Sequence, residues 1–122
     1  MRDILFRGKR VDNGEWVYGY YFGTCVTEST ITHHIRTRGG LLFEVNEETV
    51  GQYTGLKDKN GVKIFEGDKL RARKHDPYEG SIHEACVTFR NGTFWFGNWN
   101  WLEFLNIFRG VEVIGNIHDK ED

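Results

Sequence analysis

The chain has 122 residues, a formal net charge of −2 and 15% aromatic residues, with fifteen glycines and one proline. This length suits one domain or two small subdomains, and the nearly neutral charge excludes a whole-molecule field that would gather DNA or an acidic membrane. No apolar run approaches the roughly 20 residues of a membrane span, and the charged N-terminus lacks the apolar core of a signal peptide. We therefore expect a cytoplasmic protein without a membrane partner.

The N-terminal region predicts a β-hairpin. Residues 5–11 and 15–22 flank the turn residues 12–14, and alternation of side chains puts Trp16, Tyr18 and Tyr20 on one face and Tyr21 on the other. Because aromatic side chains occupy both faces, we expect the second strand to be covered on both sides or exposed for a partner.

Residues 30–37 and 41–45 predict a second hairpin around Gly39 and Gly40, with residues 24–30 as a loop of small polar residues. His33 and His34 are adjacent on a strand, so one imidazole is expected to point inward and one outward. Cys25 and Cys86 are expected to be reduced, partly buried thiols, because no CxxC spacing or export signal accompanies them.

Residues 48–70 are dense in turn residues. Asn60-Gly61 and Glu66-Gly67-Asp68 flank a short apolar run, and Asn-Gly favours a tight turn of type I′. The stretch TVGQYTGLKDKNG at residues 49–61, followed by IFEGD at residues 64–68, resembles the signature of the YopX family of phage and prophage proteins. Residues 5–9 with 16–20 resemble the opening of that family, and residues 113–118 resemble its closing strand. The resemblance implies a mostly β protein of a family without an established activity, and it transfers no catalytic residue.

The C-terminal half predicts strands at residues 69–74 and 111–117 and a hairpin around Asn91-Gly92. In that hairpin Val87, Phe89, Phe94 and Phe96 are expected to face the core, whereas Trp95 is expected at a surface. Between residues 98 and 108 the apolar residues recur at the spacing of a helix, and Asn98 or Asn100 could cap its N-terminus. The predicted buried face of this helix consists of Trp101, Leu102, Leu105 and Phe108.

These elements predict a mainly β chain with one short helix. We expect a single YopX-like domain over residues 1–122, made of an N-terminal β-hairpin subdomain at residues 1–49 and a small SH3-like β-barrel at residues 50–118.

Three classes of function fit these features. A metal-dependent enzyme would use His75 and His83 with Asp76 or Glu84, but solvated loop histidines explain the same residues, and no nucleophile, phosphate loop or cofactor motif accompanies them. We therefore expect no catalytic residue, metal, cofactor or small-molecule substrate.

A nucleic-acid-binding module would use Lys69, Arg71 and Arg73, which share one face of a strand, together with a surface aromatic such as Trp95 or Tyr78. A solvated strand explains the same cations, because edge strands carry them to deter aggregation. The favoured class is a non-enzymatic phage or prophage accessory protein. It would form a homo-oligomer or bind a protein partner through the exposed aromatics Trp16, Tyr18, Tyr20 and Tyr21.

Overall fold

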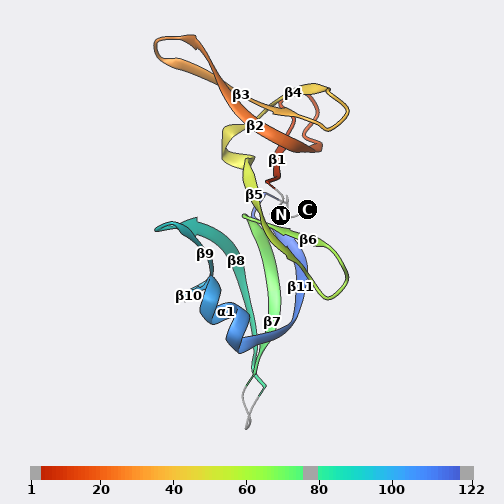
Figure 1. The fold of residues 1–122 in the computed structure, drawn as a ribbon, viewed down its shortest axis with the longest axis vertical. Helices are drawn as coiled ribbons and strands as arrows, with labels where there is room; N and C mark the ends of the chain where they lie inside the picture. Colours follow the sequence, from red (N-terminus) through yellow and green to blue (C-terminus); the bar gives the residue numbers. More distant parts are fainter. Residues whose placement is uncertain (1–3, 76–79, 119–122) are drawn as a thin grey trace. The chain divides into compact units, whose positions relative to one another are not determined.

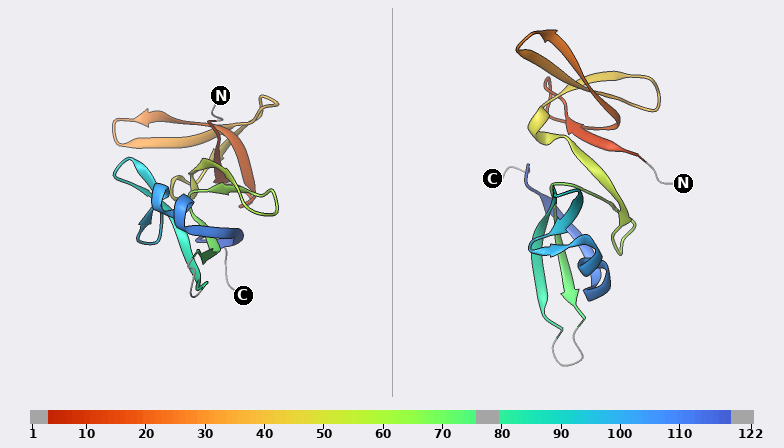
Figure 2. Two further views of the ribbon diagram at one scale, coloured as in Figure 1. Left: turned by 60° about the horizontal axis from the view of Figure 1, so that its bottom comes forward. Right: turned by 60° about the vertical axis from the view of Figure 1, so that its left-hand side comes forward.

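The computed structural model describes residues 4–75 and 80–118, which form two compact units, Met1–Tyr53 and Thr54–Asp122. The chain is mainly β, with two antiparallel sheets and one short helix, as predicted (Figures 1 and 2). The expected subdomain boundary lies after residue 49, whereas the two units divide after Tyr53.

The first unit is an antiparallel sheet. Its strands lie in the order β4-β3-β2-β1, followed by the first residues of β5. The bounds are β1 Phe6–Lys9, β2 Trp16–Thr27, β3 Thr30–Arg36, β4 Leu42–Val45, the 3-10 turn η1 Glu47–Thr49 and β5 Gly51–Lys57.

Both predicted N-terminal hairpins are confirmed. β1 pairs with β2 around the turn at residues 12–14, and β3 pairs with β4. A Cβ on Gly19 would stand 2.0 Å from the carbonyl oxygen of Arg36, so only glycine allows the backbone of β3 to pass this close. Ile35 and Val45 form the buried centre of this unit.

The predicted loop at residues 24–30 is wrong. β2 continues to Thr27 and β3 begins at Thr30, so only Glu28 and Ser29 form the turn. Thr and Val suit an extended backbone because they are β-branched. The segment looked like a loop because it is polar and lacks the apolar alternation of a half-buried strand.

The second unit contains the rest of β5 beside β6 and a five-stranded sheet in the order β10-β9-β8-β7-β11. Neither sheet closes on itself within residues 4–75 and 80–118, so the SH3-like barrel is not confirmed. The bounds are β6 Lys63–Phe65, β7 Asp68–Lys74, β8 Ile82–Arg90, β9 Thr93–Phe96, β10 Trp99–Asn100, α1 Trp101–Ile107 and β11 Phe108–Asn116.

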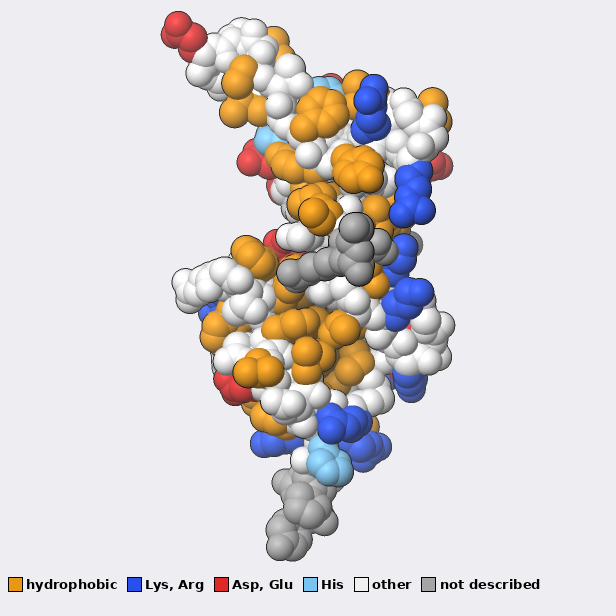
Figure 3. All heavy atoms as spheres, in the orientation of Figure 1, with side chains coloured by type: hydrophobic (Ala, Val, Ile, Leu, Met, Phe, Trp, Pro, Cys, Tyr) orange, Lys and Arg blue, Asp and Glu red, His pale blue; other side chains and the backbone are white. Residues whose placement is uncertain are grey.

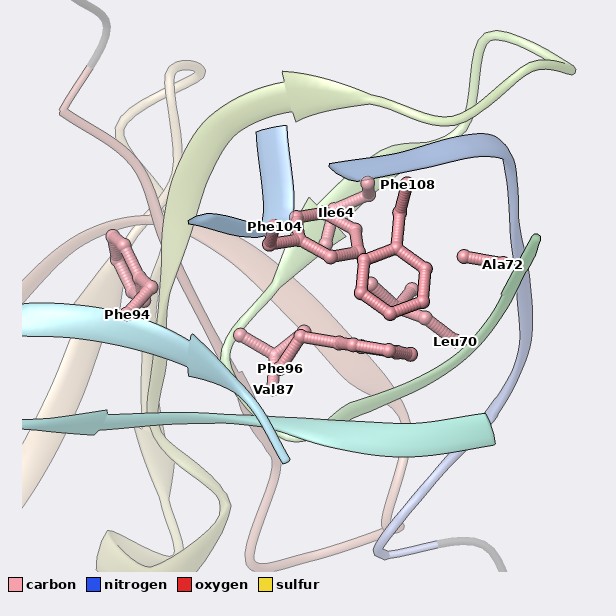
Figure 4. Close-up of a cluster of buried hydrophobic side chains, with 8 residues drawn as sticks. All are labelled: Ile64, Leu70, Ala72, Val87, Phe94, Phe96, Phe104 and Phe108. Atoms are coloured by element: carbon pink, nitrogen blue, oxygen red, sulfur yellow. The ribbon is translucent and has the colours of Figure 1, made fainter. Parts of the chain in front are cut away.

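The core of the second unit lies between this sheet and the helix. Figure 4 shows its side chains, contributed by β6, β7, β8, β9, α1 and β11, pointing toward one another. The members are Ile64, Leu70, Ala72, Val87, Phe94, Phe96, Phe104 and Phe108.

The hairpin of β8 and β9 has the predicted register, with Arg90 opposite Thr93 and Val87 opposite Phe96. Asn91 and Gly92 both have positive φ angles, as a type I′ turn requires. Phe89 is exposed rather than part of the core. Of the four it lies nearest the turn, and its ring makes an edge-to-face contact with Phe94.

The helix is confirmed, and Asn100 caps it by accepting a hydrogen bond from the Glu103 N–H. Its predicted buried face is wrong at Leu102, which is 71% exposed, and at Leu105, which is also exposed, whereas Phe108 is buried as predicted and Trp101 packs against the core. Phe104 is the buried residue, and it stacks on Trp101 and Phe108. The inward side therefore starts from Trp101 and follows the spacing i, i+3, i+7.

Candidate functional site

An exposed row of aromatic side chains follows one face of β2. Tyr18, Tyr20 and Phe22 are 45%, 59% and 39% exposed, and we call these three residues the aromatic strip. They share a face because side chains alternate along a strand. Figure 3 shows hydrophobic and cationic side chains next to one another on the visible face of this unit. The strip is an apolar surface that the first unit leaves exposed.

Cations border the aromatic strip on both neighbouring strands. Arg7 of β1 lies opposite Tyr18, and Arg36 of β3 lies opposite Tyr20. Trp16 is half-buried, because the guanidinium of Arg7 lies 4.4 Å from its ring centroid and Lys9 lies beside the same ring. Trp16 thus packs against two cations, and Tyr18 and Tyr20 are more exposed than Trp16.

Tyr21 lies on the opposite face of β2 and does not belong to the strip. Its hydroxyl is 2.5 Å from Nδ1 of His33, and the two rings stack. His34 stacks on Phe22 on the other side of the sheet. The two imidazoles lie on opposite faces of the sheet, as expected, but both are half-buried, so neither is freely exposed. Aromatic neighbours on β2 cover both rings.

Phe22 was missed as a member of the strip. Its signal was available, since it continues the alternation of Trp16, Tyr18 and Tyr20 by one more step. It was missed because the second strand was expected to end there.

The second candidate surface is the outer face of β7. Lys69, Arg71 and Arg73 are exposed there, whereas Leu70 and Ala72 are buried in the core, as predicted. The guanidinium of Arg71 makes two contacts of 2.8 Å with Glu84 of β8. Arg73 donates a hydrogen bond of 2.7 Å to the carbonyl oxygen of Gly80. One of the three predicted cations is therefore neutralised within the sheet.

A further cation, Arg109 of β11, joins this face directly opposite Arg73. Arg109 is held by hydrogen bonds to the carbonyl oxygens of Leu105, Asn106 and Phe108 at the end of the helix. Like charges opposite each other on neighbouring strands are unfavourable unless an anion lies between them.

A hollow of about 350 Å³ lies over this part of the sheet. Cations outnumber carboxylates in its lining, which is Lys59, Arg71, Ala72, Arg73, Ile82, Arg109, Gly110 and Glu112. Lys59 and Glu112 of this lining form an ion pair of 3.5 Å. The hollow suits an anionic group.

Trp95 lies on the same sheet face but is half-buried. The guanidinium of Arg90 lies 4.3 Å from its ring centroid, and its indole N–H donates to the Arg90 carbonyl oxygen. One face of the ring is thus covered by the protein's own cation. The other predicted aromatic, Tyr78, lies outside the described residues.

The residues considered for metal or nucleophilic chemistry are dispersed. His83 packs edge-on against Trp99 and Phe108 and contacts Ser81, whereas His75 is exposed. Asp76 lies outside the described residues. Within the described part of the chain, no three His, Cys, Asp or Glu side chains are grouped as a metal site would require. Cys86 is half-buried as expected, but Cys25 is exposed because it lies on the extended part of β2.

Two buried aspartates organise the turn-rich stretch at residues 48–70. Asp58 accepts hydrogen bonds from the N–H groups of Asn60, Val62 and Val113, and Asp68 accepts one from Phe65. Asn60 does not have a positive φ angle, so the predicted type I′ turn is wrong and the Asp58 carboxylate shapes the loop instead. The stretch therefore has a structural role.

The environment of Asp58 shifts its acidity. Burial by itself raises the pKa of the Asp58 carboxyl, but the N–H groups of Val113, Val62 and Asn60 lower it by more. Its net pKa lies below the ordinary value, so the carboxylate stays charged.

The chain is similar to known proteins both in sequence and in fold. Residues 5–121 match the family model described as YopX protein. The crystal structure of protein EF1440 from Enterococcus faecalis is similar over 97% of this chain and 95% of that chain, with 24% identity and a TM-score of 0.57. No curated protein matches the chain.

Among the described residues, no helix has the length and hydrophobicity needed to cross a bilayer.

Proposed function

This chain belongs to the YopX family, and we propose that it is a non-catalytic phage or prophage accessory protein that self-associates or binds a protein partner through the aromatic strip of β2. The observation that carries the proposal is the exposure of Tyr18, Tyr20 and Phe22 in one row on a sheet face. Aromatic residues are enriched at protein interfaces because they bury a large area with few rotatable bonds.

The arrangement of neighbours favours contact with protein. Trp16 and Arg7 are packed against each other, which gives the strip a fixed border. His34 supports Phe22 from β3. A rigid aromatic surface loses little conformational entropy on binding, so more of the buried apolar area contributes to affinity.

Substitution of the two tyrosines tests this proposal. In the double variant Tyr18→Ser, Tyr20→Ser we expect self-association, measured by sedimentation velocity, to weaken at least tenfold. Leu102→Ser is the matched control, because Leu102 is an exposed apolar residue of the second unit. Equal association of the double variant and the wild type would reject the strip as the interface.

The outer face of β7 supports a second candidate function, binding of a nucleic acid. The specific observation is the pair Arg73 and Arg109, which lie opposite each other at a hollow bordered mainly by cations. A phosphate group would relieve the repulsion between the two guanidinium groups. The ion pair of Arg71 with Glu84 weakens this candidate, since it uses one of the cations.

Titration with single- and double-stranded DNA and RNA, followed by tryptophan fluorescence, tests the second candidate at about 50 and 200 mM salt. Binding through this face should weaken steeply at the higher salt. The double variant Lys69→Glu, Arg73→Glu should abolish it, whereas Lys57→Glu on β5 should change it little. Absence of binding at both salt concentrations would eliminate this candidate.

A further inference from the structure

The hollow of about 350 Å³ over β7 and β11 lies entirely within the second unit, where these two strands pair side by side (Figure 1). Its volume falls within the roughly 300–1,000 Å³ that is typical of small-molecule sites. Four cations line it, Lys59, Arg71, Arg73 and Arg109. Their distribution relative to nearby carboxylates indicates what kind of ligand the hollow suits.

One end of the hollow is electrically balanced. Arg71 contacts Glu84 of β8 at 2.8 Å, and Glu112 of β11 lies opposite it on the other side. Glu112 also pairs with Lys59 at 3.5 Å. Two cations and two carboxylates therefore meet here, so this end offers little net charge to an anion.

The other end of the hollow holds positive charge without a carboxylate. Arg73 lies between Ile82 of β8 and Arg109 of β11, which are its direct neighbours in the sheet. Within residues 4–75 and 80–118, no carboxylate forms an ion pair with either arginine. The two guanidinium groups therefore concentrate positive charge beside the apolar side chain of Ile82.

A β-bulge in β11 brings Arg109 and Glu112 onto the same face of the sheet. The three steps from Arg109 to Glu112 match only two steps on β7, from Arg73 to Arg71, so β11 contains one extra residue. Gly110 lies in the bulge with a φ angle of 62°, which glycine adopts without strain. Without the bulge, the side chains of Arg109 and Glu112 would point to opposite faces. The backbone of β11 thus contributes to both ends of the hollow.

The two guanidinium groups are held in place but keep donors for a ligand. Arg109 makes its three hydrogen bonds to carbonyl oxygens through Nη1 alone, and Arg73 bonds the Gly80 carbonyl oxygen through Nη1 alone. In the described part of the chain, Nε and Nη2 of both arginines have no protein acceptor. Because the protein already orients both groups, binding of an oxyanion would cost little additional side-chain entropy.

We propose that this hollow binds a phosphate monoester of a small molecule, with the phosphoryl group between Arg73 and Arg109. A phosphate monoester carries about −1.5 to −2 charges at neutral pH, which matches two guanidinium groups, whereas each phosphodiester of a nucleic acid carries one. Ile82 lies beside Arg73 and would contact an apolar part of the attached molecule.

The balanced end of the hollow favours this ligand over a nucleic acid. A nucleic-acid strand needs cations that continue along its backbone, but the ion pair of Arg71 with Glu84 interrupts the row from Arg73 to Lys69. A single phosphate group needs only the end at Arg73 and Arg109. The inference goes beyond the proposed function, since it concerns the second unit and requires no self-association.

Two small esters test the charge of the ligand. In NMR titrations of the isotope-labelled chain, methyl phosphate should shift the Nε–Hε signals of Arg73 and Arg109 saturably. Dimethyl phosphate, a diester with a single charge, should bind on the order of tenfold more weakly. Equal affinity for the two esters, or no saturable shift with methyl phosphate, would overturn the site.

Phenyl phosphate and inorganic phosphate separate an ester from the free ion. Phenyl phosphate should bind more tightly, because its ring can cover the side chain of Ile82, which is 57% exposed. Equal or tighter binding of inorganic phosphate would overturn the ester and assign the hollow to the free ion.

Glutamine substitutions test the two arginines. Arg73→Gln and Arg109→Gln should each weaken the binding of methyl phosphate by about tenfold, because each removes charge-assisted hydrogen bonds. Lys69→Gln is the matched control, since Lys69 is an exposed cation on the same face of β7 but outside the lining of the hollow. Arg73→Gln leaves the bonds of Arg109 to the end of the helix intact, so its result stands even if Arg109→Gln lowers the melting temperature. Unchanged binding in Arg73→Gln would overturn the assignment.

An oligonucleotide without terminal phosphates separates this inference from the nucleic-acid candidate. It should not displace methyl phosphate from Arg73 and Arg109, and displacement would overturn the monoester in favour of that candidate. Failure of methyl phosphate to bind would leave self-association through the aromatic strip intact, and a monomeric chain would leave the phosphate site intact. The two proposals therefore fail separately.

Discussion

At the residue scale, Asp58 shows what the turn-rich stretch does. Its carboxylate accepts three backbone N–H groups, two from its own loop and one from Val113 of β11. The resemblance to a known family rests most heavily on this stretch, and its buried acids are engaged by the backbone. The buried aspartates Asp58 and Asp68 of this stretch therefore stabilise the fold.

Asp58→Asn should destabilise the protein by about 2 kcal/mol, the usual range for hydrogen bonds to a charged acceptor. The asparagine amide keeps one acceptor oxygen and turns an N–H₂ group toward one of the backbone donors. Chemical denaturation at neutral pH measures the loss. A variant as stable as the wild type would contradict the role assigned to this carboxylate.

The same residue predicts a pH dependence. Because the folded pKa of Asp58 lies below its unfolded value, its contribution to stability is complete above about pH 4 and disappears as the pH falls through the folded pKa. The stability difference between the wild type and Asp58→Asn should therefore shrink on acidification. Unfolding curves from pH 7 to pH 3 compare the two proteins, and a constant or growing difference would reject this linkage.

At the scale of elements, the helix α1 shows what the spacing of apolar residues can predict and what it cannot. Its existence and its Asn100 cap could be predicted, because both depend on local sequence. Its buried face could not be predicted, since five of its seven residues are apolar and more than one side of the helix could face the core. Stacking of Phe104 on Trp101 and Phe108 decided between them.

Truncation of two neighbouring helix residues tests the buried face. Phe104→Ala should cost about 4 kcal/mol, because it removes a ring from a closed core. Leu105→Ala, at an exposed position, should cost less than about 1 kcal/mol. Thermal or urea unfolding measures both, and equal costs would contradict the packing of this helix.

The hairpin of β8 and β9 was predictable residue by residue, because the Asn91-Gly92 turn sets its register. The hairpin formed by β2 and β3 was predicted only at its base. Sequence patterns detect strands through one buried face, and the outer half of this hairpin buries neither face.

The candidate surfaces were predictable to different extents. Alternation placed Lys69, Arg71 and Arg73 on the outer face of β7, as observed. The ion pair of Arg71 with Glu84 and the approach of Arg109 to Arg73 depend on pairing between strands distant in sequence. Such pairings have no local signal.

At the scale of the whole molecule, the two units carry different surfaces. The first presents the aromatic strip of β2, and the second presents cations around a hollow. The net charge of −2 lets copies approach each other with little repulsion. For this reason we propose self-association ahead of binding to a polyanion.

Sedimentation velocity of the wild-type chain across a range of micromolar concentrations tests the central claim most directly. The account predicts a concentration-dependent species of twice the 14.3 kDa chain mass, whose formation the double variant Tyr18→Ser, Tyr20→Ser weakens at least tenfold. A single species of 14.3 kDa at every concentration would contradict association of two copies through β2.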